Sequence, residues 1–284
     1  MKNLIFSIYK PVDVDRKFTA KQTNTIKQFE KYFDKLISNK EEYAKLIGAE
    51  FKLVTPKESS FDNINFEKLF LLDKFADDYD NVLYLDLDVV INTNTSFFEK
   101  FNMNTLVSRY EKCSRYDRLG LECLLETLTD DNEELRKYVR SIKQKGRWEE
   151  FAKQHIDKHY DEAYSKLDKY HWLRKGQELK KILPIAEEWI INTAITGGSS
   201  ETIKKLNLID EYKTYTNWCN THPSFKNNEI FLTYLIQKRK YPFTNLPEWW
   251  HHLCLKSKDT VANACMWHVV DKNFERVFKM QNFS

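Results

Sequence analysis

Hydrophobic positions in the first hundred residues switch between two patterns along the chain. Short apolar runs bounded by polar residues cover residues 3–9, 49–56 and 81–85, and apolar positions at helical spacing cover residues 21–46 and 65–79. The short runs are typical of strands, and the longer periodic segments are typical of amphipathic helices. Because the two kinds of segment alternate, the pattern predicts an α/β fold with a mostly parallel central sheet flanked by helices.

Two further zones follow this first half. Residues 111–183 are highly charged and contain no strand-like run, so they predict a helical insertion. Residues 184–284 return to mixed structure, with a helix expected in residues 227–240. We therefore expect one domain in which residues 1–110 form the first half and residues 184–284 form the second.

Composition fits a globular protein with a large core. The chain has 284 residues, of which 42% are hydrophobic, and its 45 Lys and Arg residues nearly balance its 42 Asp and Glu residues. The two signs are interleaved along most of the chain, so no nucleic-acid-binding face is expected. No run approaches the roughly 18 apolar residues of a membrane span, which leaves only contact with a membrane surface open.

The cysteines and the first residues bear on location. Five cysteines form no C-x-x-C pair, and a chain of this size needs no disulfides, so we expect reduced thiols and a cytoplasmic protein. The opening residues, MKNLIFSIYKPVDVDR, contain an apolar run that is shorter than the apolar region of a typical secretory signal peptide. They are expected to form the first strand instead.

Two acids, Asp86 and Asp88, interrupt the apolar stretch NVLYLDLDVVI at residues 81–91. Residues i and i+2 of a strand project to the same face, and two carboxylates about 4 Å apart repel by roughly 4 kcal/mol at an effective dielectric constant near 20. The pair is therefore expected at the end of the strand, where a divalent cation such as Mn²⁺ or Mg²⁺ would turn the repulsion into binding. The alternative is a solvated pair of aspartates in a turn.

The glycines exclude two large classes of nucleotide-binding enzyme. None of the six is arranged as G-x-G-x-x-G or as G-x-x-x-x-G-K-[ST]. Dinucleotide-dependent dehydrogenases and P-loop kinases need those loops to hold phosphates, so the chain belongs to neither class.

Four segments resemble those of nucleotide-sugar-dependent glycosyltransferases with the GT-A fold, and the likeness is closest to the retaining enzymes of family 8. The stretch YLDLDVVI is similar to the D-x-D region of that family, and WIINTAITGG, Trp189 to Gly198, is similar to the segment that lines its sugar pocket. NNEIFLTYL resembles the start of a later helix that carries an acidic pair in that family, with Asn228 and Glu229 at the two positions. MWHVVDKNF resembles the C-terminal H-x-x-G-x-K element, although Val-Val-Asp stands in place of the glycine spacing.

The resemblance implies roles for particular residues. It assigns the metal ion to Asp86, Asp88 and His268, and it assigns catalytic roles to Asn192, which would meet sugar hydroxyls, and Glu229, which would accept a proton or stabilise an oxocarbenium-like centre. Asp86 would also bind the nucleotide-sugar, with Lys68 and Lys272, at the diphosphate. Ser7, Ile8 and Tyr9 would lie at the base and ribose.

The expected activity is that of a metal-dependent hexosyltransferase. It would move a sugar from a nucleotide-sugar, with a UDP-sugar as the expected donor, to a carbohydrate or other hydroxyl acceptor, with retention of configuration. The insertion is expected beside the acceptor. Trp249 to His252, WWHH, is interpreted either as an aromatic platform for a sugar ring or as a packed loop.

Two alternatives stay open at this point. A phosphatase of the haloacid-dehalogenase type also carries D-x-D after an apolar strand, but it has Gly-Thr or Thr-Val where this chain has Val89 and Val90, and its motif normally opens the chain. The other alternative is a non-catalytic sugar-binding protein on a GT-A frame.

Overall fold

The computed structural model describes residues 1–10, 20–61, 64–112, 133–134, 137, 189–221, 223, 226–254 and 262–281. Its contacts divide the chain into two compact units. One comprises Met1–Arg109, Asn192–Asn228 and Tyr241–Ser284, and the other comprises Tyr110–Ile191 and Glu229–Lys240. The predicted helical insertion of residues 111–183 lies almost entirely outside the described residues, so it stays a prediction, as does the single-domain division.

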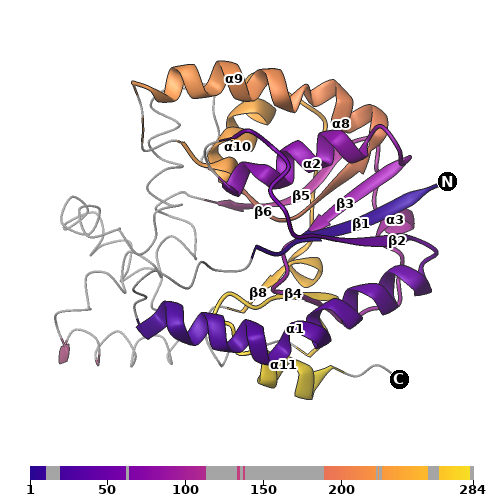
Figure 1. Ribbon diagram of the computed structural model, residues 1–284, viewed down its shortest axis with the longest axis vertical. Helices are drawn as coiled ribbons and strands as arrows, with labels where there is room; N and C mark the ends of the chain where they lie inside the picture. Colours follow the sequence, from indigo (N-terminus) through magenta and orange to yellow (C-terminus); the bar gives the residue numbers. More distant parts are fainter. Residues whose placement is uncertain are drawn as a thin grey trace. The chain divides into compact units, whose positions relative to one another are not determined.

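Most of the first unit's strands belong to a six-stranded sheet with the order β2-β1-β3-β6-β5-β7, in which one end of β5 and one end of β6 are part of the second unit (Figure 1). β1 pairs in parallel with both β2 and β3, β7 pairs in parallel with β5, and β3 pairs antiparallel with β6. The strands are β1 (Asn3–Ile8), β2 (Glu50–Val54), β3 (Asn81–Leu85), β5 (Leu106–Lys112), β6 (Trp189–Ser199) and β7 (Phe243–Asn245). The prediction of a mostly parallel α/β sheet is confirmed.

Helices cover both faces of this sheet. Figure 1 shows α2, α8 and α9 on one face and α1 with α11 on the other. These helices are α1 (Ala20–Leu46), α2 (Glu67–Phe75), α8 (Ser200–Leu206), α9 (Leu208–Cys219) and α11 (Phe274–Met280). Short helical turns are η1 (Ile64–Phe66), α3 (Phe97–Lys100) and η4 (Glu248–Trp250), and α10 (Asn228–Arg239) belongs almost wholly to the second unit. The helices expected in residues 21–46, 65–79 and 227–240 are thus confirmed.

A second, three-stranded sheet holds the residues that follow the two acids. Its order is β4-β9-β8, with β4 (Val89–Ile91), β9 (Met266–His268) and β8 (His252–Leu253). β9 runs antiparallel to β4 and parallel to β8, and its His268 stands opposite Val89 in the register. The apolar stretch of residues 81–91 is therefore not one strand, because it leaves the large sheet at Leu85 and enters the small one at Val89.

The close approach of β6 to β3 explains one glycine of the WIINTAITGG segment. Gly197 stands opposite Leu83 in the antiparallel ladder, and a Cβ atom at Gly197 would lie 2.9 Å from the carbonyl oxygen of Val82. Such a contact is too short to tolerate, so any side chain there would push the two strands apart.

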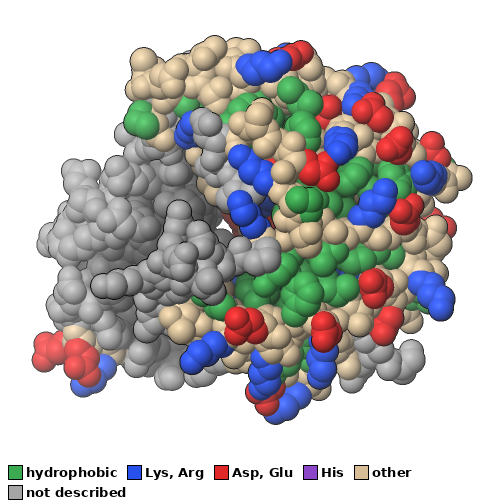
Figure 2. Space-filling model, in the orientation of Figure 1, with side chains coloured by type: hydrophobic (Ala, Val, Ile, Leu, Met, Phe, Trp, Pro, Cys, Tyr) green, Lys and Arg blue, Asp and Glu red, His purple; other side chains and the backbone are tan. Residues whose placement is uncertain are grey.

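The surface and the cysteines add three observations. Figure 2 shows Lys and Arg side chains interspersed with Asp and Glu on the face in view, in keeping with the interleaved charges of the sequence. Among the helices in the described part of the chain, none is both long enough and apolar enough to cross a bilayer. Cys219, Cys254 and Cys265 are free thiols, whereas the other two cysteines lie outside the described residues.

Candidate metal centre

The two acids lie in a turn at the carboxyl end of β3. The amide of Asp86 donates to the carbonyl of Ala194 at 2.7 Å and so extends the β3–β6 ladder by one bond. The amide of Val89 then donates to the carbonyl of Asp86 at 3.0 Å, which closes a four-residue turn. The expectation that the acids stand at the end of the strand is confirmed, and this edge of a parallel sheet is where α/β proteins bind ligands.

The small sheet brings His268 to the acids. Because His268 pairs with Val89, the next residue after Asp88, its ring reaches the turn, and its Nε2 lies 3.5 Å from Oδ2 of Asp88. Each of Asp86, Asp88 and His268 offers one ligand atom, and these atoms lie within 4.8 Å of one another. The structure therefore gathers the three residues that the sequence assigned to a metal ion.

Two lysines are paired with the acids. Lys68, from α2, donates to Oδ1 of Asp86 at 3.0 Å and to the hydroxyl of Thr193 at 3.3 Å. Lys272 donates to Oδ2 of Asp88, the same oxygen that faces His268. Each carboxylate of the turn thus has one ammonium partner, and both lysines were expected at the diphosphate.

The backbone at Lys272 is unusual for a residue with a side chain. Its φ of +57° is in the left-handed region, which costs a non-glycine residue about 1 kcal/mol. The amide of Lys272 donates to the carbonyl of Val269 at 3.0 Å, and the amide of Val269 donates to the carbonyl of Asp88 at 2.9 Å. These bonds hold the tight turn after β9, which directs Lys272 back toward Asp88.

Asp88 carries a negative charge in this setting. Burial alone would raise the pKa of its carboxyl group, but the adjacent Lys272 and His268 hold that pKa well below its usual range. Tyr84 donates its hydroxyl to Asp86, and burial followed by the Asp86 charge raises the pKa of Tyr84 well above its usual value, so it stays a donor. The turn therefore presents an ionised carboxylate to any cation.

The chemistry of this donor set fits a divalent ion. Two carboxylates and one imidazole are ligands for Mn²⁺, which accepts nitrogen donors more readily than Mg²⁺ does. Three protein ligands leave positions in the coordination sphere for phosphate oxygens. Asp86, Asp88 and His268 would hold the ion.

A buried lysine beneath the turn was not found from the sequence. Lys40 of α1 is fully buried, and its ammonium group donates to the carbonyls of Leu36 at 3.3 Å, Leu87 at 3.0 Å and Val89 at 2.7 Å. Burial lowers the pKa of Lys40 to about 7 against the opposing effect of the charges of Asp88 and Asp86. Lys40 lies four residues after Leu36 on the apolar stripe of the helix. Its place on that stripe was the signal in the sequence that could have indicated its burial.

Asn39 holds the next part of β4. Its side-chain amide donates to the carbonyl of Ile91 at 2.9 Å and accepts from the amide of Ile91 at 2.8 Å. Successive residues of α1 thus bind the backbone of the turn and of the strand that follows it.

The three residues expected at the base and ribose lie at the end of β1. Ser7 is buried and donates its hydroxyl to the carbonyl of Leu85 at 2.7 Å, so it supports the start of the acidic turn. Ile8 is half-buried. Tyr9 is also half-buried, and its ring lies 4.6 Å from that of Phe33. Their contact with a nucleotide stays a prediction.

The two residues expected to act in catalysis have different surroundings. Asn192 is half-buried in β6, and its side-chain oxygen accepts from the amide of Ala194 at 3.1 Å. The neighbouring Thr193 accepts from the buried side chain of Asn228 at 2.7 Å as well as from Lys68. Glu229 is half-buried in the first turn of α10 and belongs to the second unit.

The WWHH segment supplies a second histidine next to the candidate metal centre. Trp249 is 57% exposed, whereas Trp250 is buried, with its ring 5.0 Å from that of Phe101. His251 is fully buried, and its Nε2 lies 3.2 Å from Nδ1 of His268. Burial, His268 and Arg109 together hold the pKa of His251 well below its usual range. Most of the segment is therefore packed, in line with the interpretation of a packed loop. The exposed ring of Trp249 is the part that would be free to contact a sugar.

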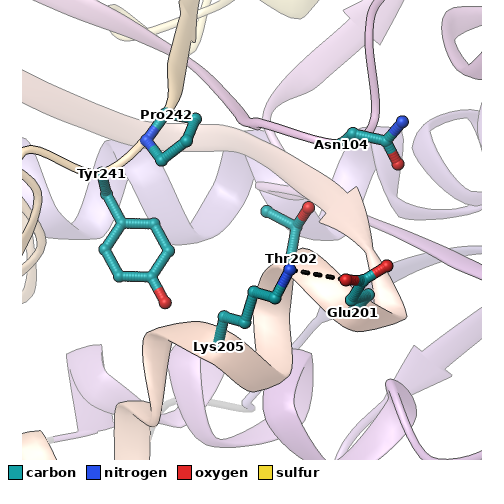
Figure 3. A pocket seen from close by; sticks show the side chains of 6 residues that line it. All are labelled: Asn104, Glu201, Thr202, Lys205, Tyr241 and Pro242. Carbon is teal, nitrogen blue, oxygen red and sulfur yellow. Dashed lines mark hydrogen bonds and ion pairs between the residues drawn. The ribbon is translucent and has the colours of Figure 1, made fainter.

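The described residues also form a pocket of about 260 Å³ that is lined by none of the residues above (Figure 3). Lys205 and Glu201, the two charged residues in its wall, are paired with each other. The pocket is lined by Asn104, Glu201, Thr202, Lys205, Tyr241 and Pro242.

Comparisons with known proteins give similarity in structure alone. No protein-family model matches the chain, and no curated protein sequence matches it significantly. A solved glycosyltransferase involved in glycosylation of the major capsid of PBCV-1 is similar over 99% of this chain and 98% of its own, with 10% identity and a TM-score of 0.48. The bifunctional glycosyltransferase WbbM is similar over 100% of this chain and 50% of its own, with 9% identity and a TM-score of 0.45. At this level of similarity, function is inferred from the residues of the chain itself.

Proposed function

We propose that this protein is a metal-dependent glycosyltransferase that moves a sugar from a nucleotide-sugar, with UDP as the favoured nucleotide, to a glycan or other hydroxyl acceptor. The observation that carries the proposal is the gathering of Asp86, Asp88 and His268 at the carboxyl end of β3, with one lysine beside each acid. Retention of configuration is part of the proposal and rests on the resemblance of the His268 segment to that of the retaining enzymes.

The arrangement suits the departure of a nucleoside diphosphate. Cleavage of the bond between sugar and diphosphate leaves negative charge on a phosphate oxygen, and a divalent ion held by the three ligands would stabilise that charge. Lys68 and Lys272 are half-buried cations next to the same carboxylates, so they add donors for the phosphate oxygens. Asn192 would bind sugar hydroxyls, and Glu229 would act on a proton or on the developing positive charge of the sugar.

A screen of nucleotide-sugars tests the proposal directly. The purified protein is incubated with each donor and Mn²⁺, with and without an acceptor mixture, and released nucleoside diphosphate is measured. We expect release from one donor or a few, and we expect a chelator to stop it. A phosphatase would instead free inorganic phosphate from phosphate esters, and a non-catalytic sugar-binding protein would bind a donor or sugar without any release.

Replacement of Lys272 is expected to raise the affinity for the metal ion and to lower the affinity for the nucleotide. In the protein without metal its ammonium group occupies the Asp88 oxygen that faces His268, so Lys272→Met is expected to raise Mn²⁺ affinity by roughly tenfold. The same change should lower the affinity for the nucleotide at saturating Mn²⁺ by roughly 10- to 100-fold, since a hydrogen bond to a charged group contributes about 1.5–3 kcal/mol. Titrations of metal and of nucleotide measure the two effects.

Lys279→Met is the matched control for this experiment. Lys279 is exposed and pairs with Glu275, so its loss removes the same charge from the same end of the chain away from the acids. Both affinities should stay at their wild-type values. A fall of Mn²⁺ affinity in Lys272→Met would contradict competition between the ammonium group and the metal ion.

A further inference from the structure

We propose that His251 is a positioning residue that orients His268 as a nitrogen ligand and thereby sets the preference of the site for Mn²⁺ over Mg²⁺. This inference rests on the proposed metal site and extends it to a residue that touches neither metal nor substrate. His251 was singled out in the sequence only as part of the aromatic WWHH segment.

The geometry fixes both ends of the His268 ring. Its Nε2 faces Oδ2 of Asp88 at 3.5 Å, and its Nδ1 lies 3.2 Å from Nε2 of His251. The two rings have centroids 5.4 Å apart and are tilted by 34°, so they meet edge to edge through their nitrogens. His268 has only these two nitrogen atoms, and the contact with His251 therefore determines which one is left for a ligand role.

The backbone of His251 is held on both sides. Its amide donates to the carbonyl of Glu248 at 3.2 Å, its carbonyl accepts from the guanidinium group of Arg109, and the residue is fully buried. The following residue, His252, begins β8 and pairs with Trp267 of β9, next to His268. The backbone at His251 is thus placed directly next to the small sheet that places His268.

A ligand role for His268 requires a particular distribution of protons. Binding through Nε2 needs a free electron pair on that atom, so the proton of the neutral ring must sit on Nδ1 and be donated to Nε2 of His251. Without a metal ion, the opposite arrangement lets Nε2 of His268 donate toward Asp88 while Nδ1 accepts from His251. An imidazole can serve both states because it offers a donor and an acceptor, and an apolar side chain can serve neither.

A pair of substitutions at His251 separates this role from simple packing. His251→Gln keeps an amide near the position of Nε2 that can accept or donate, whereas His251→Leu fills space without a polar atom. Mn²⁺ affinity is measured from the electron paramagnetic resonance signal of free Mn²⁺, and Mg²⁺ affinity is measured by competition with Mn²⁺, in both cases without nucleotide. Thermal unfolding of each variant reports on the fold.

We expect a large loss of affinity for Mn²⁺ but not for Mg²⁺, and only in the leucine variant. His251→Leu should lower Mn²⁺ affinity by roughly 10- to 100-fold, as loss of such outer hydrogen bonds does in other metal sites, and should change Mg²⁺ affinity by less than about threefold. His251→Gln should stay within about threefold of the wild type for both ions. If the leucine variant does not fold, His251→Asn, whose amide is one bond too short to reach His268, replaces it in the comparison.

Four outcomes would overturn the inference, and the last of them also contradicts the proposed function. Unchanged Mn²⁺ affinity in the leucine variant would show that His268 needs no support, and an equal fall for both ions, or equal losses in the glutamine and leucine variants, would indicate packing alone. If the wild-type protein binds no Mn²⁺, the metal site itself is refuted and the proposed function loses its main support. If the wild-type protein does bind Mn²⁺, a negative result in the variants refutes only the role of His251 and leaves the proposed function standing.

Discussion

Asp88→Asn is expected to abolish Mn²⁺-dependent nucleotide binding while the protein stays folded. Asp88 supplies an ionised oxygen to the cluster, and the amide of asparagine has nearly the same shape without the charge. Because removal of outer partners of metal ligands already costs about 10- to 100-fold, loss of a charged ligand should lower Mn²⁺ affinity by more than about 100-fold. Nucleotide affinity is measured as a function of Mn²⁺ concentration, and the wild-type dependence should vanish in the variant.

The control for this experiment makes the same chemical change elsewhere. Asp77 is an exposed aspartate paired with Lys204 at 2.9 Å, so Asp77→Asn also neutralises one lysine-paired carboxylate. It should bind Mn²⁺ and nucleotide as the wild type does. If Asp88→Asn shows the wild-type dependence on Mn²⁺, the acids form only a turn, and the glycosyltransferase proposal loses the observation that carries it.

The second large effect is expected in the pH dependence of stability. The pKa of Lys40 is about 7 in the folded protein and 10.5 as its reference value, so between these values the unfolded chain binds one more proton than the folded chain does. The free energy of unfolding therefore rises with pH across this window, by at most about 1.36 kcal/mol per pH unit. Below about pH 7 the lysine is charged in both states, and this slope disappears.

Comparison with a variant isolates the contribution of Lys40. Between pH 7.5 and 9.5 the wild type should gain about 2 kcal/mol of stability relative to Lys40→Met, which has no group to titrate there. Urea unfolding in the presence of a chelator measures the difference. Lys45→Met alters an exposed lysine of the same helix and should keep the wild-type slope. Parallel curves for the wild type and Lys40→Met would mean that Lys40 is not forced toward neutrality by burial.

The sequence predicted that the two acids stand at the end of a strand because strong local signals coincide there. Two carboxylates at i and i+2 within an apolar stretch have few stable arrangements, and the end of a strand is one of them. The parallel pairing of β1 with β2 and β3 also follows from alternation of strands and helices. His268 was assigned through the resemblance of its segment to a known element, and only the pairing of β4 with β9 brings it near the acids.

The parts of the site that the sequence did not reveal depend on tertiary packing. Lys40 looks like an ordinary charged residue of a helix, and its burial is compensated by carbonyl groups of the acidic turn and of β4, 47 and 49 positions away. His251 stood in an aromatic cluster whose side chains point in different directions once η4 and β8 form, and its contact with His268 follows from the register of the small sheet. Such contacts have no periodic signature, because each depends on how separate elements dock.

The pairing of β4 with β9 also bears on how the protein is made. Asp88 and Lys272 are separated by 184 positions, so on the ribosome the acidic turn emerges long before the segment that completes its surroundings. A nascent chain arrested before β9 would expose the apolar face of β4 and would hold two acids without their histidine. Loading of the proposed metal site is therefore expected only after synthesis of β9, and binding of an ion there would report that β4 and β9 have paired.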